Sequence, residues 1–402
     1  MTKKLKFSVG NDNGNSEQDI IIDGKLIRQP NVNCPVDGLP WTEEIVPESL
    51  VTNLLDQLIV TVDSPSARPG MYYVGQFALK SGEILDNMQV GIDMKCDVDL
   101  PIINTLANIS GYAVQKVYED TNELPESIQV KVDMTTALPV TQHSEESAAK
   151  FEQRFMINGQ AHKVTVHLGK KRVNVEVIFS YVKAIPEATP VTFSIQKSLD
   201  GEWRKDDIFK EFAETNKLEK VTGQYFADKR ILHIDIGDGT TEYPVTVGNQ
   251  FLRQFVHGSN HGAGHAIEEA LDEFNRLIHL PDSPRQFFSD VVKQPTHKYH
   301  DRAQKTLRLP LDNQAKQIIR NVRNQLTKTR NEIDVLIVYG GGSILMRSVL
   351  EPYLKTLCEE REIQLFYIPK EYAVTMNAEG LYIFTKSKIF TALKAKSQQA
   401  TV

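Results

Sequence analysis

The chain has 402 residues, of which 46 are basic and 52 acidic, so its net charge is −6. A chain of this length usually forms about two domains. With 41% hydrophobic and 24% charged residues it fits the globular class, and the disordered, collagen-like and disulfide-scaffold classes are excluded. The mildly acidic balance gives no general attraction to nucleic acid.

Three cysteines, far apart and without a CxxC pair, suit a reducing compartment and argue against a thiolate zinc site. The first residues, MTKKLKFSVG, lack the apolar core of a secretory signal, and no run approaches the roughly 20 apolar residues of a membrane span. We therefore expect a cytoplasmic protein that does not bind a membrane. No Walker A sequence and no complete GxGxxG occur, so a nucleotide would be bound by another device.

The first half of the chain is predicted to mix strands and helices. Strands over 4–9 and 19–22 flank Asn13-Gly14, a strong hairpin signal, and Asp23-Gly24 predicts a second turn. Further strands are predicted over 58–62, 90–94, 128–134, 164–168, 173–177 and 179–185, and helices over 101–117 and 144–155. The polar, helix-prone stretch 197–229 is the expected place of an inter-domain crossing or an insertion.

The second half repeats the pattern of a strand, an acid and a glycine turn. The remaining predicted elements are strands over 231–236, 243–247, 334–339 and 365–368, and helices over 263–278, 312–329, from 344 onward, and 379–396. A strand that ends in an acid and a glycine hairpin occurs at Asp12 and again at Asp235. This repetition predicts two related α/β domains.

The two Asp hairpins have the composition of phosphate-binding turns. Turns rich in Gly, Asn and Thr present consecutive backbone N–H groups, which suit phosphate oxygens. Neither Asp12 nor Asp235 can bind phosphate directly, but each can accept hydrogen bonds from the water ligands of a bound Mg²⁺. Two such turns could hold a triphosphate from both sides. For Asn13-Gly14 taken alone, the alternative is an ordinary hairpin.

A glycine triplet, Gly340–Gly342, stands between a predicted strand and the start of a helix. Glycines permit close approach of the backbone to a ligand, and a helix start favours phosphate. The alternative is a glycine-rich turn without a ligand.

Four motifs spread over nearly the whole chain resemble, in order and spacing, those of one ATPase superfamily. They are Asp12-Asn13-Gly14-Asn15, Asp235-x-Gly237-x-Gly239-Thr240-Thr241, Val338-Tyr339-Gly340-Gly341-Gly342-Ser343-Ile344-Leu345 and Met376-Asn377-Ala378-Glu379-Gly380-Leu381. They resemble the phosphate-1, phosphate-2, adenosine and second-connector motifs of the actin/sugar-kinase/heat-shock-chaperone superfamily. Within it, GGGSILMR and NAEGLYIF most resemble bacterial actin-like, ParM-type plasmid-segregation proteins.

The resemblance implies an α/β, actin-like two-domain fold with ribonuclease-H-like duplicated halves and a nucleotide in the inter-domain cleft. Domain I would comprise 1–190 and 378–402, and domain II 191–377. Asp12 and Asp235 would hold Mg²⁺ through water. The phosphates of ATP or GTP would be cradled by Asn13, Gly14, Asn15, Gly237, Gly239, Thr240 and Thr241, and Gly340, Gly341, Gly342 and Ser343 would line the α-phosphate and adenosine side.

The resemblance also implies a catalytic residue in the first connector, where ParM-like relatives have Pro-Glu after a strand. Pro186-Glu187 fits that pattern. Glu187 would orient the attacking water, which suffices because positioning and charge stabilisation dominate phosphoryl transfer. Glu187 lies farther from Asp235 than the family pattern leads us to expect, because the 197–229 stretch intervenes. The alternative is that Glu187 is a surface turn residue.

Other polar clusters are expected to be structural. His257, His261 and His265 recur every four residues, but the glycines among them disfavour a helix through the segment, so we expect a loop and helix start rather than a zinc site. Two basic clusters are interpreted as solvated faces. They are His162, Lys163, Lys170, Lys171 and Arg172, and Arg320, Arg323, Lys328 and Arg330.

The function that the resemblance implies is an ATPase that polymerises head to tail into nucleotide-dependent filaments for plasmid segregation. Its partners would be further copies of itself and a DNA-binding adaptor on a plasmid centromere, without direct DNA binding. One alternative is a small-molecule kinase of the same fold, which would need a catalytic Asp and a substrate pocket. The other is a non-hydrolysing scaffold.

Overall fold

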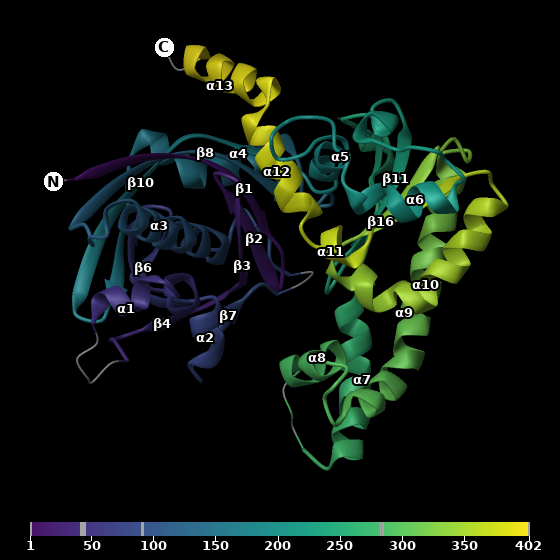
Figure 1. The fold of residues 1–402 in the computed structure, drawn as a ribbon, viewed down its shortest axis with the longest axis horizontal. Helices are drawn as coiled ribbons and strands as arrows, with labels where there is room; N and C mark the ends of the chain where they lie inside the picture. The colour runs from purple at the N-terminus through teal and green to yellow at the C-terminus, as the bar shows by residue number, and fades with distance from the viewer. Residues whose placement is uncertain (1, 41–45, 90–91, 282, 284, 401–402) are drawn as a thin grey trace. The chain divides into compact units, whose positions relative to one another are not determined.

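The computed structural model describes residues 2–40, 46–89, 92–281, 283 and 285–400. The chain divides into two compact units (Figure 1): unit 1 is Met1–Glu202 with Asn377–Val402, and unit 2 is Trp203–Met376. The first boundary falls within the stretch 197–229, where the crossing was expected. Residues 191–202, which the sequence prediction assigned to the second domain, lie in unit 1.

Unit 1 is built on a ten-stranded sheet of order β3-β2-β1-β8-β10-β9-β5-β6-β4-β7. Its strands are β1 (Lys3–Asn13), β2 (Glu17–Ile22), β3 (Lys25–Pro30), β4 (Val32–Val36), β5 (Ile59–Ser64), β6 (Ala67–Val74), β7 (Asp86–Asn87), β8 (Ser127–Leu138), β9 (His162–Leu168) and β10 (Lys171–Pro186). Strands β1, β8 and β10 are parallel, so their carboxyl ends share one edge of the sheet. The weak strand predicted over 90–94 begins outside the described residues, and Ile92–Met94 form no strand.

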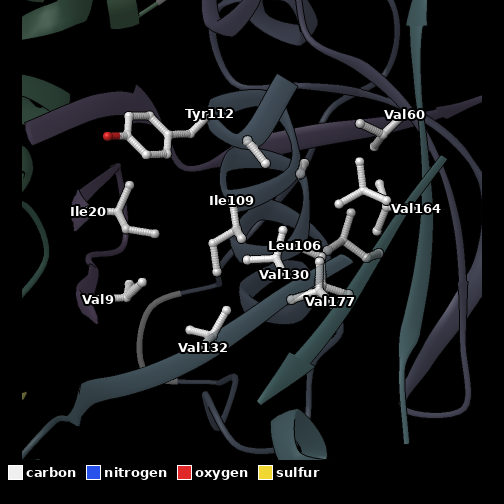
Figure 2. Close-up of a cluster of buried hydrophobic side chains, with 14 of the residues drawn as sticks. Val9, Ile20, Val60, Leu106, Ile109, Tyr112, Val130, Val132, Val164 and Val177 are labelled. Atoms are coloured by element: carbon white, nitrogen blue, oxygen red, sulfur yellow. The ribbon is translucent and has the colours of Figure 1, made fainter. Parts of the chain in front are cut away.

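Helices cover both faces of this sheet. They are α1 (Pro47–Val51), α2 (Gln76–Lys80), α3 (Leu100–Thr121), α4 (Glu145–Met156), α5 (Thr189–Gln196), α12 (Met376–Lys386) and α13 (Lys388–Ala400), with 3-10 helices η1 (Leu54–Gln57) and η2 (Ile157–Gly159). Leu106 and Ile109 of α3 point toward strand valines such as Val130 in the main core (Figure 2). Phe193 of α5 packs against Phe384 of α12 in a second core. The buried α5 therefore belongs to unit 1.

The prediction of a single helix over 379–396 is wrong. The segment forms α12 and α13, which separate at Ser387, whose Oγ accepts a hydrogen bond from Phe390 N at 3.2 Å. A serine that caps a new helix in this way ends the preceding one. Helix α12 approaches its neighbours at two glycines, because a Cβ on Gly10 would overlap the backbone of Tyr382, and one on Gly380 that of Pro190.

Unit 2 has a mixed sheet in which β11 pairs in parallel with β16, and β16 with β17. Its strands are β11 (Arg230–Ile236), β12 (Thr241–Glu242), β13 (Val245–Val247), β14 (Gln250–Phe251), β15 (Gly258–Ser259), β16 (Val335–Tyr339) and β17 (Gln364–Tyr367). Its helices are α6 (Lys210–Thr215), α7 (Ala263–Ile278), α8 (Arg285–Lys293), α9 (His300–Lys328), α10 (Gly341–Glu359) and α11 (Lys370–Ala373), with 3-10 helices η3 (Asp207–Phe209), η4 (Gly223–Phe226) and η5 (Arg253–Phe255). Helix α7 confirms the prediction over 263–278, whereas α9 begins well before the predicted residue 312.

The stretch 203–229 forms a layer on the sheet of unit 2. Phe212 and Phe226 lie 4.7 and 5.5 Å from Phe366 of β17, measured between ring centroids, and Phe209 stacks on Phe226 at 5.5 Å. The opposite sheet face packs on α7, α9 and α10. The aromatic residues of this stretch are scattered among many polar residues. The composition of the stretch therefore gives no sign that it contributes to the core. Among the described residues, no helix combines the length and apolar character needed to cross a membrane.

Burial of His233 makes the stability of unit 2 depend on pH. The side chain is inaccessible to solvent, its Nε2 lies 2.8 Å from Thr246 Oγ1, and burial lowers the pKa of His233 to about 3. In the unfolded chain the pKa is near 6.5. Between about pH 6.5 and pH 3, the unfolded chain protonates His233 but the folded chain does not. The contribution of His233 to the free energy of unfolding is therefore fully present above about pH 6.5 and is lost as the pH falls toward 3.

The free energy of unfolding of the wild-type protein should fall between pH 7.5 and pH 5. We predict that in His233→Asn this fall is smaller by about 2 kcal/mol. Chemical denaturation at the two pH values measures this difference. His279→Asn is the matched control, because His279 is exposed and has the left-handed backbone (φ 56°) that asparagine tolerates. An unchanged pH dependence in His233→Asn would contradict the prediction.

Candidate functional site

In unit 1, two of the predicted site residues lie at the same edge of the sheet. Asp12 is near the carboxyl end of β1, and Glu187 directly follows β10. Between them, β8 ends at Leu138, whose carbonyl oxygen accepts a hydrogen bond from Glu187 N at 2.9 Å. Because ligands of open α/β sheets bind outside the carboxyl ends of parallel strands, this edge is a candidate site.

The hairpin after Asp12 differs in detail from the prediction. Asn13 is still paired with Gln18, and the connection runs over 14–16 rather than as a two-residue Asn-Gly turn. Glycine is needed at position 14, because a Cβ there would lie 2.7 Å from Glu17 O. Asn31 holds the connection: its Nδ2 donates to Gly14 O at 2.6 Å and its backbone N to Ser16 O at 2.9 Å.

The Asn13 side chain turns away from this edge. It is fully buried, and its Nδ2 donates to Thr105 Oγ1 of α3 at 3.2 Å, as does Asn11 Nδ2 at 2.8 Å. Because side chains alternate along a strand, Asp12 faces the other side of β1. A phosphate contact by Asn13 is thus limited to its backbone, while Asn15 lies half-buried in the connection.

Glu187 has a partner that the sequence analysis missed. Lys95 Nζ donates to Glu187 Oε1 at 2.6 Å, and the side chains of Lys95 and Glu187 are 2% and 16% exposed. Glu187 is therefore not a surface turn residue. The two lie far apart in the sequence, in segments without a common motif, so no local signal could have revealed the pair.

In unit 2, the other predicted residues gather at the carboxyl ends of β11 and β16. The register pairs Asp235 with Tyr339, so Gly340 follows directly beside the carboxylate of Asp235. Beyond Asp235 the chain makes a tight turn, in which Gly237 N donates to Thr240 O at 2.9 Å. The Asp hairpin and the glycine triplet, about 100 residues apart in the sequence, are thus neighbours.

Of the three glycines Gly340–Gly342, only Gly341 has space around the position of a side chain. A Cβ on Gly340 (φ 89°) would lie 2.5 Å from Ile236 O, and one on Gly342 would lie 2.7 Å from Gly237 O. Ser343 Oγ donates to Gly340 O at 2.7 Å. Gly341 is exposed, with nothing within 4 Å of a Cβ built on it, in the first turn of α10, where backbone N–H groups lack intrahelical acceptors. An anion would fit beside this residue.

The start of α7 also packs against the turn, which the sequence analysis did not predict. Ala263 N donates to Gly237 O at 3.1 Å and Gly264 N to Asp238 O at 2.7 Å. A Cβ on Gly262 would overlap the backbone of Asp238, and one on Gly264 would lie 2.6 Å from Asp238 Oδ1, so these two glycines serve this packing.

The side chains around the turn are held by internal contacts. Thr241 Oγ1 donates to His261 O at 2.6 Å, whereas Thr240 is half-buried and Gly239 buried. Arg285 forms ion pairs with Asp238 and, at 3.2 Å, with Glu268. Arg285 was not among the predicted site residues, because a lone arginine in a helix carries no local signal.

The three histidines of the run contact different partners. The nearest polar partners of His257, His261 and His265 are Asn321, Gln314 and Gly239 O respectively. Within the part of the chain that the structure describes, no three His, Cys, Asp or Glu side chains are arranged to hold a metal ion. The predicted loop and helix start is confirmed, because α7 begins at Ala263.

The assignment of His162 to a solvated basic face is wrong. His162 is fully buried, its Nδ1 lies 2.8 Å from Ser64 Oγ and its Nε2 2.6 Å from Phe155 O. Strand alternation places this residue inside, while its neighbour Lys163 is exposed.

Comparison with known proteins identifies the fold. No protein-family model matches the chain, and no curated protein matches it. Among solved structures, the chain is similar to the actin-like protein Alp7A, with a TM-score of 0.69, 16% identity and coverage of 98% of this chain and 100% of that one. It is also similar to the archaeal actin homolog Ta0583, with a TM-score of 0.63, 14% identity and coverage of 94% and 99%. A Bacillus thuringiensis ParM with ATP gives a TM-score of 0.60, 12% identity and coverage of 95% and 98%. The predicted α/β, actin-like fold is confirmed.

We predict that alanine affects stability very differently at two adjacent glycines. Gly342→Ala should destabilise the protein by about 1–3 kcal/mol, because the new methyl group meets the backbone of Gly237. Gly341→Ala, whose methyl group enters open space, should change the unfolding free energy by less than about 0.5 kcal/mol. Chemical denaturation of both variants checks the pair, and equal stabilities would contradict the packing described for α10.

Proposed function

We propose that this chain, which has the actin-like fold, is an ATPase of ParM type that assembles into nucleotide-dependent filaments and takes part in plasmid segregation. The observation that carries the proposal is the repeated acid at a strand end, Asp12 in unit 1 and Asp235 in unit 2, each followed by a glycine turn. The similarity to Alp7A and ParM over nearly the whole chain supports it.

Each unit by itself carries groups whose chemistry suits a magnesium nucleotide. Asp12 and Asp235 are half-buried, so their carboxylates can accept hydrogen bonds from the water ligands of Mg²⁺. When bound, Mg²⁺ would neutralise phosphate charge. The backbone N–H groups at Gly341 and in the Gly14 and Gly237–Thr240 turns would bind phosphate oxygens. The ParM of Bacillus thuringiensis is described with ATP, which favours ATP as the first nucleotide to test.

Hydrolysis would depend on Glu187. Its carboxylate lies at the carboxyl edge that also carries Asp12, and it retains 16% exposure, enough to accept a hydrogen bond from water. A water-orienting carboxylate suffices for phosphoryl transfer, in which positioning and charge stabilisation dominate. A sugar-type kinase would instead need a general base and a pocket for a second substrate.

Assembly would join identical subunits head to tail. A contact between two different faces of the same molecule does not close and therefore produces a filament. A DNA-binding adaptor on a plasmid centromere would link the filament to DNA, since the chain is acidic overall.

We predict that Mg-ATP causes the protein to sediment as polymer and to release phosphate, and that Asp235→Ala abolishes both by removing magnesium-nucleotide binding. Asp272→Ala, which removes an exposed carboxylate from α7, should behave as wild type. Pelleting, phosphate release and nucleotide titration measure these effects, with GTP and ADP run in parallel. ATP turnover that requires a sugar, without polymer at any concentration, would favour the kinase.

We predict that Glu187→Gln leaves nucleotide-dependent assembly intact and slows phosphate release by about 10- to 100-fold. Glutamine is preferred to alanine because its amide oxygen can still accept a hydrogen bond from the buried Lys95. Normal release by this variant would move the catalytic role to another residue.

A further inference from the structure

Lys95 carries a buried charge that the proposed mechanism has not used. Its side chain is 2% exposed, and lysine is almost never buried without a specific partner. Its ammonium group donates to Glu187 Oε1 at 2.6 Å. Because the desolvation of two charges can outweigh their attraction, a buried ion pair is weak evidence for a purely stabilising role.

The surrounding contacts hold the backbone of the segment that bears Lys95. The backbone N of Lys95 donates to Gln142 Oε1 at 3.1 Å, and Gln142 Nε2 donates to Asp93 O at 3.1 Å. Gln142 N in turn donates to Pro139 O at 2.8 Å, just beyond the end of β8. The segment that bears Lys95 is thereby tied to the same sheet edge as Glu187.

The Glu187 backbone is held to that edge independently. Glu187 N donates to Leu138 O, and Ala188 adopts a left-handed conformation with φ 67° as the chain enters α5. The backbone position of Glu187 is therefore set by β8, whereas the direction of its carboxylate depends on the contact with Lys95. A flexible glutamate side chain would otherwise sample several rotamers.

We propose that Lys95 is a positioning residue for Glu187, an inference that rests on the proposed role of Glu187 in hydrolysis. The ammonium holds Oε1, and the carboxylate thus presents its other oxygen to the attacking water in a fixed direction. Lys95 itself touches neither the water nor the phosphates in this role. Its contribution is made only through the orientation of Glu187.

A double-mutant cycle tests this role with Lys95→Met, Glu187→Gln and the double variant. Methionine keeps the length of the side chain and removes its charge. In the otherwise wild-type chain, Lys95→Met should lower the rate of phosphate release at saturating Mg-ATP by about 10- to 100-fold, with the nucleotide dissociation constant unchanged. In the Glu187→Gln background, the catalytic carboxylate that Lys95 orients is already absent, so the same substitution should lower the rate by less than about twofold.

Two further variants separate positioning from folding. Lys95→Arg retains a cation that can bind the carboxylate, so it should recover part of the rate lost in Lys95→Met. Lys150→Met is the matched control: Lys150 pairs with Asp97 at 2.7 Å, but both side chains are at least half exposed, and its rate should equal that of wild type. If Lys95→Met does not fold, Lys95→Arg takes its place in the cycle, with a smaller loss expected.

An unchanged rate in Lys95→Met, or an equal loss in the Glu187→Gln background, would overturn the inference about Lys95 alone. A wild-type protein that binds Mg-ATP without hydrolysing it would overturn the proposed ATPase, and the inference with it. Loss of nucleotide binding in Lys95→Met would place the residue in binding rather than in the positioning of Glu187.

Discussion

Parallel strand pairing is the constraint on which the candidate site of each unit depends. In unit 1, the pairing of β1, β8 and β10 brings Asp12 and Glu187 to one sheet edge. In unit 2, the pairing of β11 with β16 places Gly340 beside Asp235. Parallel pairing has this effect because it aligns the carboxyl ends of strands that are remote in sequence. Each candidate site is thus defined within its own unit.

Close backbone approach is the second requirement, and it explains most of the site glycines. Gly340 and Gly342 let α10 begin against β11, and Gly262 lets α7 begin against the turn after that strand. Gly380 allows α12 to cross α5 in the same way. These glycines therefore serve mainly the packing of helices against their neighbours, whereas Gly341 is exposed and has no such contact.

Buried polar side chains connect the candidate site to the rest of unit 1. Asn31 binds the carbonyl oxygens of the connection after Asp12, and Lys95 binds the carboxylate of Glu187. A polar group buried without such a partner would cost about 1–3 kcal/mol, so these contacts hold the connection and the carboxylate in place. We expect this preorganisation to matter for a reaction that depends on the position of water.

The sequence by itself predicted many of the strands, because alternation and turn signals act over a few residues, and the resemblance of its glycine motifs to one superfamily implied the α/β actin-like fold. It did not determine that Asn13 faces α3, that α12 and α13 are separate helices, or that His162 is buried. Only the tertiary structure decided the pairing of Lys95 with Glu187 and the aromatic layer formed by 203–229. These features depend on contacts between segments far apart in the chain, where the periodicity of a single segment carries no information.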